Sequence, residues 1–340
     1  MSRDLINDAR ALITEYSAGT YLFEDSSANS IGQILATMGQ NRKISLVMSD
    51  SEEAWNVKLQ EKIKLSFISN GLSIYRGIIR GAVQNAAVED VLRIATILEE
   101  CEPDIVTIVG GGSAIDAGKT AVIYSKLKPE FPDINNYEGE GKISAMLAKS
   151  GKNIPQILAF QTSISPAHIS SSAEIYSARD NRILFLSDPA LRPSRALFDP
   201  RSTLSLQPQR VKNGALEAFS HCLETYITYQ GDYAEYIEYS CLTAMEIVVR
   251  YARKAIDSED LEARAAIALA SDIGGIALMT ANANCGHLNV GMAREKIEHP
   301  ALCALLNPYY LILYSNAIGD KLAKIAEMLK SCGLNIETAG

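Results

Sequence analysis

The feature that most constrains this chain is an apolar strand pattern that runs directly into a glycine turn and a helix. Ile105–Val109 is a β-branched apolar run, typical of a buried parallel strand. Three glycines follow at 110–112, and Ser113 opens a segment with helical apolar spacing. The unpaired N–H groups and the positive end of the helix dipole point at such a turn, so it can bind an anion. A tight turn with no ligand gives the same pattern.

Two charged residues follow the turn on the first turns of the predicted helix. Asp116 and Lys119 are three residues apart, so they share a helix face and can address one bound ligand. They favour a phosphate or diphosphate site over an empty turn.

Strand and helix patterns alternate along the first part of the chain. Apolar runs at 44–48, 71–79 and 155–162 indicate strands, and 52–68 and 88–100 have helical spacing. Shorter strand candidates are 174–177, 183–187 and 196–198. This alternation predicts a parallel sheet with helices on both faces.

After Asp199-Pro200 the pattern changes to long helices. They are expected at 211–229, 233–256, 260–279, 301–317 and 319–331. The pattern therefore predicts an α/β domain with a parallel sheet over 1–199, followed by an all-α domain over 200–340; the family resemblance given below implies that the first binds a dinucleotide and the second the metal and substrate. A chain of 340 residues is long enough for two such cores.

Composition excludes several classes of partner. The net charge is −8 and no basic run stands out, so nucleic acid is not expected as a partner. The first residues lack the apolar core of a signal peptide, and no apolar run is long enough to span a bilayer, so no membrane partner is expected. Six scattered cysteines argue against a zinc ribbon or a disulfide framework. We expect buried, reduced thiols in a cytoplasmic protein.

The helical part carries a candidate metal site. Three of the four histidines lie there, and Glu217 precedes His221 by four residues, so both occupy one helix face. His287 and His299 lie at element ends, where functional side chains tend to project. A carboxylate and three imidazoles suit Fe²⁺ or Zn²⁺ with an open position for a substrate oxygen. A helix salt bridge or a capped surface histidine is the alternative interpretation of Glu217 and His221 alone.

These segments together resemble the iron-containing alcohol dehydrogenase family, within the group that also holds dehydroquinate synthase and glycerol dehydrogenase. The resemblance covers roughly residues 20–330, and its motifs are 110–119, 188–193, 196–200, the helix 217–226, and His299 nine residues before Pro308. It implies a dinucleotide-binding domain, a helical domain, one divalent metal and hydride transfer in the cleft between the domains. The implied partners are NAD, a small alcohol or aldehyde, and further copies of the chain in a homo-oligomer.

The resemblance also assigns roles to particular residues. The implied metal ligands are Glu217, His221, His287 and His299. The implied cofactor contacts are the N–H groups of Gly111, Gly112 and Ser113, together with Asp116, Thr162 and Ser163. Asp50 ends the first strand and would accept hydrogen bonds from the adenosine ribose, which favours NAD over NADP. An N-cap for the helix at 52–68 is the alternative role of Asp50.

The chain departs from the family pattern at several points. Glu217 stands where the alcohol dehydrogenases have Asp, and Glu there is similar to the zinc enzyme dehydroquinate synthase. The loop 162–174 is longer than its counterpart and has no glycine. Gly291 replaces a histidine of many relatives, so the proton route falls to His168 in that loop or to water. A solvent-exposed loop histidine is the alternative for His168.

Two other functions stay open from the sequence. The first is a sugar-phosphate cyclase that uses NAD transiently, which Glu217 and the serines at 170–172 favour. The second is a non-catalytic binding or assembly protein that keeps the fold, which Gly291 and the glycine-free loop favour.

Overall fold

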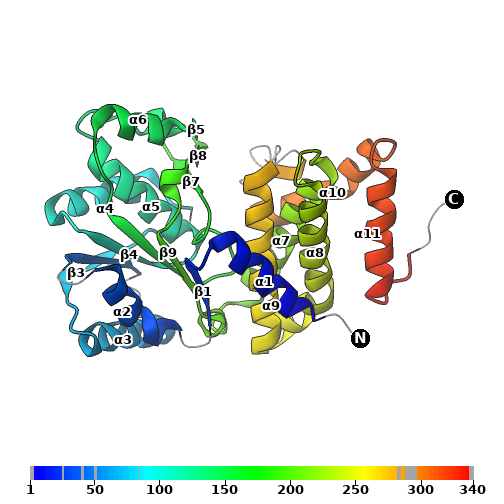
Figure 1. Cartoon of the computed structure of the whole chain (residues 1–340), viewed down its shortest axis with the longest axis horizontal. Helices are drawn as coiled ribbons and strands as arrows, with labels where there is room; N and C mark the ends of the chain where they lie inside the picture. Colours follow the sequence, from blue (N-terminus) through cyan, green and yellow to red (C-terminus); the bar gives the residue numbers. More distant parts are fainter. Residues whose placement is uncertain are drawn as a thin grey trace. The chain divides into compact units, whose positions relative to one another are not determined.

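The computed structural model describes residues 4–24, 27–39, 42–49, 52–83, 85–281, 285–287 and 297–336. The chain divides into two compact units, an α/β unit and a helical unit (Figure 1). The α/β unit takes in Thr20–Ser163 and Ala167–Ser205, and the helical unit takes in Met1–Gly19, Ile164–Pro166 and Leu206–Gly340. The predicted fold class, an α/β domain with a parallel sheet followed by a helical domain, is confirmed.

The α/β unit is built on a six-stranded sheet in the order β1-β9-β6-β4-β2-β3. Every neighbouring pair is parallel. The strands are β1 (Tyr21–Phe23), β2 (Ile44–Met48), β3 (Ile74–Arg80), β4 (Ile105–Gly110), β6 (Gln156–Gln161) and β9 (Arg195–Phe198). β4 lies inside the sheet between β2 and β6, so the end of β4 is where the glycine turn is held.

Helices cover both faces of this sheet, which explains the continuous apolar runs. On one face, Ile105 and Val109 pack with α2 (Ser27–Met38) and α3 (Ala54–Ser69). On the other face, Val106 and Ile108 pack with α4 (Val88–Cys101) and α5 (Gly112–Leu127). Because both sides of each central strand are buried, the sequence shows no alternation of apolar and polar residues.

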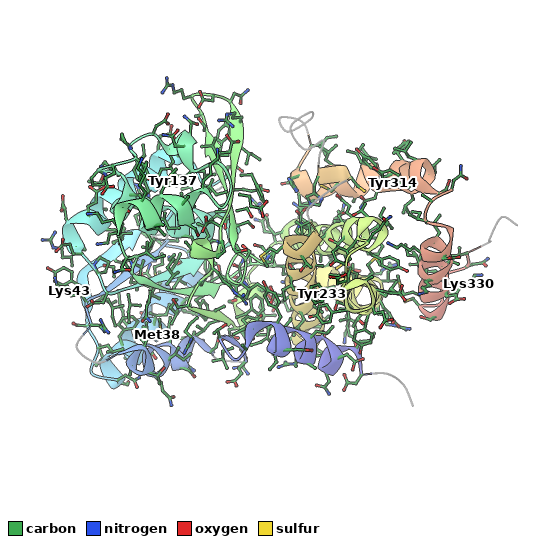
Figure 2. All side chains as sticks on the ribbon, turned by 45° about the horizontal axis from the view of Figure 1, so that its top comes forward. Met38, Lys43, Tyr137, Tyr233, Tyr314 and Lys330 are labelled. Carbon is green, nitrogen blue, oxygen red and sulfur yellow. The ribbon has the colours of Figure 1, made fainter. Side chains whose placement is uncertain are left out.

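A second, three-stranded sheet lies in the same unit. Its order is β5-β8-β7, with β5 (Gly139–Glu140), β7 (Ser172–Ser177) and β8 (Arg182–Ser187). α6 (Lys142–Ser150) follows β5. The buried Tyr137, labelled in Figure 2, lies beside Tyr124 with ring centroids 5.6 Å apart. Tyr137 thus joins this irregular part to the buried cluster on one face of the main sheet.

The helical unit contains α1 (Leu5–Ser17), α7 (Pro208–Thr228), α8 (Ala234–Asp257), α9 (Leu261–Ala281), α10 (His299–Tyr314) and α11 (Gly319–Ser331). α7, α8 and α9 pack against one another, and α1 packs on α8 and α9. α9 approaches α7 at Gly274, where a Cβ would lie 3.0 Å from the Cβ of His221. The position of His221 therefore depends on a residue without a side chain on the facing helix.

One helix corrects an expectation from the sequence. Leu261–Thr280 is long and apolar enough, by length and composition, to cross a bilayer, so the expectation that no run reaches that length was wrong. In this structure 83% of its most apolar window is buried inside the protein. Its hydrophobicity is thus used in packing against α7 and α8.

Candidate metal centre

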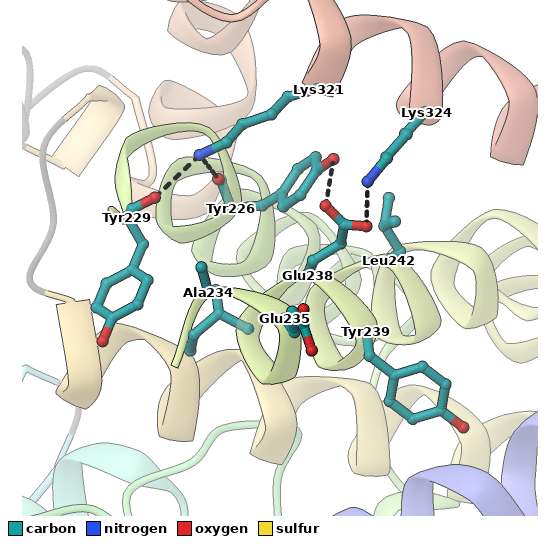
Figure 3. A pocket seen from close by; sticks show the side chains of 10 residues that line it. Tyr226, Tyr229, Ala234, Glu235, Glu238, Tyr239, Leu242, Lys321 and Lys324 are labelled. Atoms are coloured by element: carbon teal, nitrogen blue, oxygen red, sulfur yellow. Dashed lines mark hydrogen bonds and ion pairs between the residues drawn. The ribbon is translucent and has the colours of Figure 1, made fainter. Parts of the chain in front are cut away.

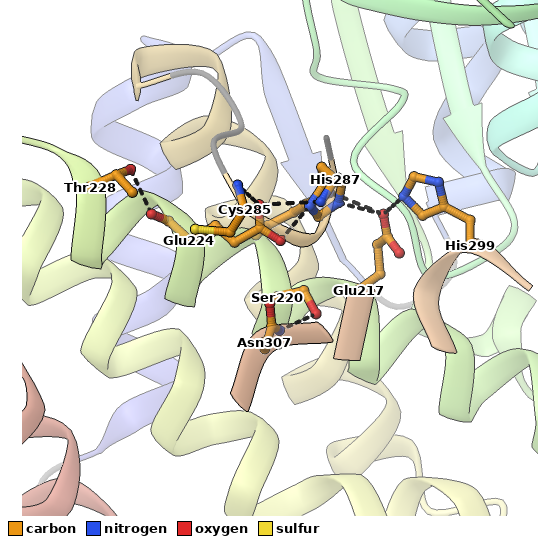
Figure 4. A network of polar contacts seen from close by, with 9 residues as sticks. Glu217, Ser220, Glu224, Thr228, Cys285, His287, His299 and Asn307 are labelled. Carbon is orange, nitrogen blue, oxygen red and sulfur yellow. Dashed lines mark hydrogen bonds and ion pairs between the residues drawn. The ribbon is translucent and has the colours of Figure 1, made fainter. Parts of the chain in front are cut away.

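Four side chains from three segments meet in the helical unit. Oε1 of Glu217 lies 3.2 Å from Nε2 of His221, 3.3 Å from Nε2 of His287 and 3.0 Å from Nε2 of His299 (Figure 4). These are the four residues that the sequence proposed as metal ligands, and the structure brings them together.

Local structure explains why these residues converge. Glu217 and His221 are one turn apart on α7, and His299 is the first residue of α10, where Pro300 occupies the first turn. Asn307 of α10 donates its side-chain amide to Oγ of Ser220 on α7 at 2.9 Å. This bond between buried groups ties the two helices together beside the cluster.

The electrostatics of the cluster centre on one carboxylate. Burial alone would raise the pKa of Glu217, but the His299 charge and hydrogen bonds from all three imidazoles outweigh it and hold that pKa well below its usual range. Burial would lower the pKa of His287, and its hydrogen bonds to Cys303, Glu217 and Glu224 outweigh burial and raise it. The carboxylate is therefore ionised and gathers three nitrogens around one oxygen.

The donor set fits a divalent metal. Oε2 of Glu217 is buried and has no hydrogen-bond partner among the described residues. A carboxylate and imidazole nitrogens are ligands that both Fe²⁺ and Zn²⁺ accept. A divalent ion at this point would bind the Glu217 carboxylate and the nitrogen lone pairs of the three imidazoles, groups that otherwise compete for protons.

Glu224 contacts the cluster, and the sequence reasoning did not single it out. It is fully buried on α7, and its Oε1 lies 2.7 Å from Nδ1 of His287. Its Oε2 accepts from the backbone N–H of Cys285 at 3.0 Å. A carboxylate on the second ring nitrogen orients a histidine ligand and leaves Nε2 to face a metal. The available signal was spacing, because Glu224 follows Glu217 by seven residues, two turns on one face.

The glycine turn has the geometry of an anion site. Gly111 lies between β4 and α5 with φ −77° and ψ 179°, and no described side chain caps α5. A Cβ on Gly111 would lie 3.1 Å from Oγ of Ser163, so glycine keeps the space between these two segments open. Thr162 donates its N–H to the carbonyl of Gly110 at 2.9 Å, which places 162–163 beside the turn. Ser113 accepts from the N–H of Asn85 at 3.1 Å.

Asp116 and Lys119 have protein partners. Nζ of Lys119 is fully buried and contacts Asp116 at 3.1 Å, the Ala167 carbonyl at 2.9 Å and the Ser172 carbonyl at 2.6 Å. Asp116 also accepts from the N–H of Glu174 at 3.1 Å. The expectation that Lys119 addresses a bound ligand is therefore wrong, because its ammonium group anchors the glycine-free loop instead. The cofactor contact of Asp116 stays a prediction.

His168 is fully buried in the α/β unit. Its ring lies 5.2 Å from the Tyr21 ring and 5.9 Å from the Phe198 ring, measured between centroids. The interpretation of His168 as an exposed loop residue is therefore wrong. Asp50 and Gly291 lie outside the described residues.

A separate pocket of about 490 Å³ lies on the helical unit, and Figure 3 shows it. Its lining comes from the end of α7, from α8 and from α11, and includes none of the four clustered donors. Lys321 donates to the carbonyls of Tyr226 and Tyr229 at 2.8 and 3.0 Å, and Lys324 pairs with Glu238. Lys321 thus satisfies carbonyls at the end of α7, a structural role.

Both units of the chain match models of one protein family. The model for iron-containing alcohol dehydrogenases matches residues 18–200. The model for the C-terminal part of the Fe-containing alcohol dehydrogenase family matches residues 212–339. The chain belongs to the iron-containing alcohol dehydrogenase family. Members use NAD(P) and a divalent metal and act on small alcohols and aldehydes.

Similar curated proteins are distant. The chain is 25% identical to 1-propanol dehydrogenase PduQ of Citrobacter freundii over 78% of this chain and 65% of that protein. It is 23% identical to an NADPH-dependent butanol dehydrogenase of Clostridium saccharobutylicum over 75% of this chain and 64% of that protein. The matches therefore span less than two thirds of the length of these relatives.

Solved structures share the fold. A 1,3-propanediol oxidoreductase is 20% identical with a TM-score of 0.79, over 95% of this chain and 80% of that one. An alcohol dehydrogenase from Oenococcus oeni is 21% identical with a TM-score of 0.78, over 93% of this chain and 80% of that one.

Proposed function

We propose that this protein is a metal-dependent, NAD-linked alcohol dehydrogenase that also reduces the matching aldehyde. The observation that carries the proposal is the convergence of three imidazole Nε2 atoms on one oxygen of Glu217 within 3.3 Å. In the part of the chain that the structure describes, this cluster contains all four donors that were expected from the sequence. The names of the relatives support small primary alcohols as substrates.

The residues that would hold the metal are Glu217, His221, His287 and His299. The chemistry that a divalent ion supplies at such a site is Lewis acidity toward an alcohol or carbonyl oxygen. Glu224 keeps Nδ1 of His287 engaged, so that Nε2 faces the cluster. A divalent ion held by these residues would favour binding of a substrate oxygen over leaving it in solvent.

The residues that would hold the dinucleotide lie at the start of α5. The N–H groups of Gly111, Gly112 and Ser113 bind the diphosphate in this proposal, since no described side chain caps the helix there. Thr162 and Ser163 lie beside the turn, and in this proposal they would contact the ribose or adenosine side. Asp50 sets the preference for NAD by repelling a 2′-phosphate.

The test measures NADH formation with the metal-free and the reconstituted protein. The proposal predicts turnover of ethanol, 1-propanol or 1,3-propanediol with NAD⁺ after Zn²⁺ or Fe²⁺ is added. Glu217→Gln removes one charged donor without changing size, and we expect a fall in turnover of roughly 10²-fold or more. Glu238→Gln is the matched control, because it removes a carboxylate of the same unit that pairs with Lys324 away from the cluster.

Other outcomes distinguish the remaining functions. Binding of metal and NADH without turnover of any alcohol, combined with activity on a sugar phosphate, would establish the cyclase. Failure to bind either metal or NADH would establish a non-catalytic protein. Equal turnover by wild type and Glu217→Gln would contradict the role of the cluster.

A further inference from the structure

We propose that the thiol of Cys303 is a fifth donor to the metal centre, an inference that rests on the proposed function and deepens it. A ring nitrogen of His287, a ring nitrogen of His299 and Sγ of Cys303 all lie within 4.8 Å of one another. No other described cysteine belongs to such a group with these histidines. A sulfur ligand changes which metal the site prefers.

The helix places Cys303 beside His299. Cys303 follows His299 by four residues on α10, so the two side chains share one face a turn apart. Side chains of a helix lean toward its N-terminus, which directs the Cys303 thiol toward the turn that carries His299. Cys303 is fully buried, so its sulfur faces protein groups and not solvent.

The His287 segment packs against the same point from the other side. A Cβ on Gly286 would lie 3.0 Å from Cα of Cys303 and 3.1 Å from Oε1 of Glu224. The backbone before His287 therefore fits closely between α10 and α7, with no room for a side chain. This packing fixes the imidazole and the thiol relative to each other.

Cys303 joins the four-residue cluster through shared members. His287 belongs both to the group with His299 and Cys303 and to a second group with Glu217 and His221. Nε2 of His299 is in turn 3.0 Å from Oε1 of Glu217. His287 and His299 therefore link Cys303 to the donors that surround Glu217.

The donor set then contains one oxygen, three nitrogens and one sulfur. A thiolate with imidazoles favours a soft or borderline ion, so the structure assigns this centre to Zn²⁺ in preference to Fe²⁺. Cysteine binds a metal as the thiolate, so the S–H proton passes to solvent when the metal–sulfur bond forms. The competing role is packing alone, since a free cysteine also behaves as a small hydrophobe.

The experiment replaces the metal of the full-length protein with Co²⁺ and records its absorption spectrum. A sulfur ligand gives an intense thiolate-to-cobalt charge-transfer band in the near ultraviolet, whereas the visible bands report bound Co²⁺ with any ligands. We expect that band in wild type and its loss in Cys303→Ser, with the visible bands retained. The Zn²⁺ affinity of Cys303→Ser should fall by about 10–100-fold.

Cys285→Ser is the matched control, because Cys285 is also buried and lies two residues before His287. It should keep the charge-transfer band. If Cys303→Ser does not fold, X-ray absorption of the wild-type zinc protein gives the answer, since a Zn–S shell near ~2.3 Å would support the proposal. If one Co²⁺ binds per chain and neither the sulfur band nor a sulfur shell appears, Cys303 is not a ligand, but the metal centre itself is still supported. A protein that binds no Co²⁺ would overturn both.

Discussion

Replacing Glu224 by glutamine tests how the metal centre is held. Glu224 accepts from Nδ1 of His287 on one oxygen and from the backbone N–H of Cys285 on the other. A glutamine side chain has one accepting oxygen and one donating NH₂ group, so the NH₂ group must replace one of the two accepting oxygens and face a donor. If the amide NH₂ faces His287, Nδ1 must accept its hydrogen bond and the ring hydrogen moves to Nε2. If the NH₂ faces Cys285 instead, it meets the backbone N–H of Cys285, and two donors then face each other.

Both arrangements weaken the site, and the size of the effect follows from the two contacts. Loss of a carboxylate that orients a histidine ligand costs about 10–100-fold in metal affinity, or about 1.4–2.8 kcal/mol. A buried donor left without an acceptor costs a further ~1–3 kcal/mol of folding free energy. We expect Glu224→Gln to bind Zn²⁺ less tightly in competition with a chromophoric chelator and to melt earlier without metal.

Glu238→Gln controls for the loss of one negative charge in the helical unit, and it should match wild type in Zn²⁺ affinity. Wild-type affinity in Glu224→Gln would refute the role assigned to this carboxylate.

Three further predictions concern the α/β unit. Asp50→Gly should narrow the preference for NAD(H) over NADP(H) in a binding titration, and equal affinity in wild type would count against Asp50. Lys119→Met should lower the free energy of unfolding, measured in urea, by roughly 3–5 kcal/mol, because the Asp116 carboxylate loses its counter-charge. The double variant with Asp116→Asn should regain part of the lost stability, and no gain would argue against the ion pair. His168→Ala should lower stability and leave the pH–rate profile unchanged, since the ring is buried and water then carries the proton. A ~10²-fold loss of turnover with a missing ionisation near neutral pH would instead make His168 the relay.

Periodic segments of the sequence were enough to predict most of the fold. The strand expected at 44–48 is β2, and the helix expected at 319–331 is α11. The helix at 88–100 ends one residue later, at Cys101. These elements have strong apolar patterns, so local sequence and tertiary packing agree. α1, α2 and α6 were not predicted, and no strand was expected at 139–140 or at 21–23.

The candidate site was predictable where its residues share a helix turn or match a family motif. Glu217 and His221 are linked by helical spacing, and His287 and His299 were proposed from their positions at element ends and from the family resemblance. The partners of Lys119 could not be read from sequence, since Ala167 and Ser172 lie about fifty residues away and only the fold brings them together. Cys303 carried a usable signal, its spacing of four from His299, which a search limited to histidines and carboxylates passes over.

Metal content is the measurement that tests the central claim most directly. Elemental analysis of protein expressed in medium supplemented with iron and zinc should find one divalent ion per chain in wild type. His221→Ala should lose most of that ion, because it removes a nitrogen 3.2 Å from Oε1 of Glu217. Wild-type protein without metal, or full occupancy in His221→Ala, would contradict the assignment of Glu217, His221, His287 and His299 as a metal centre.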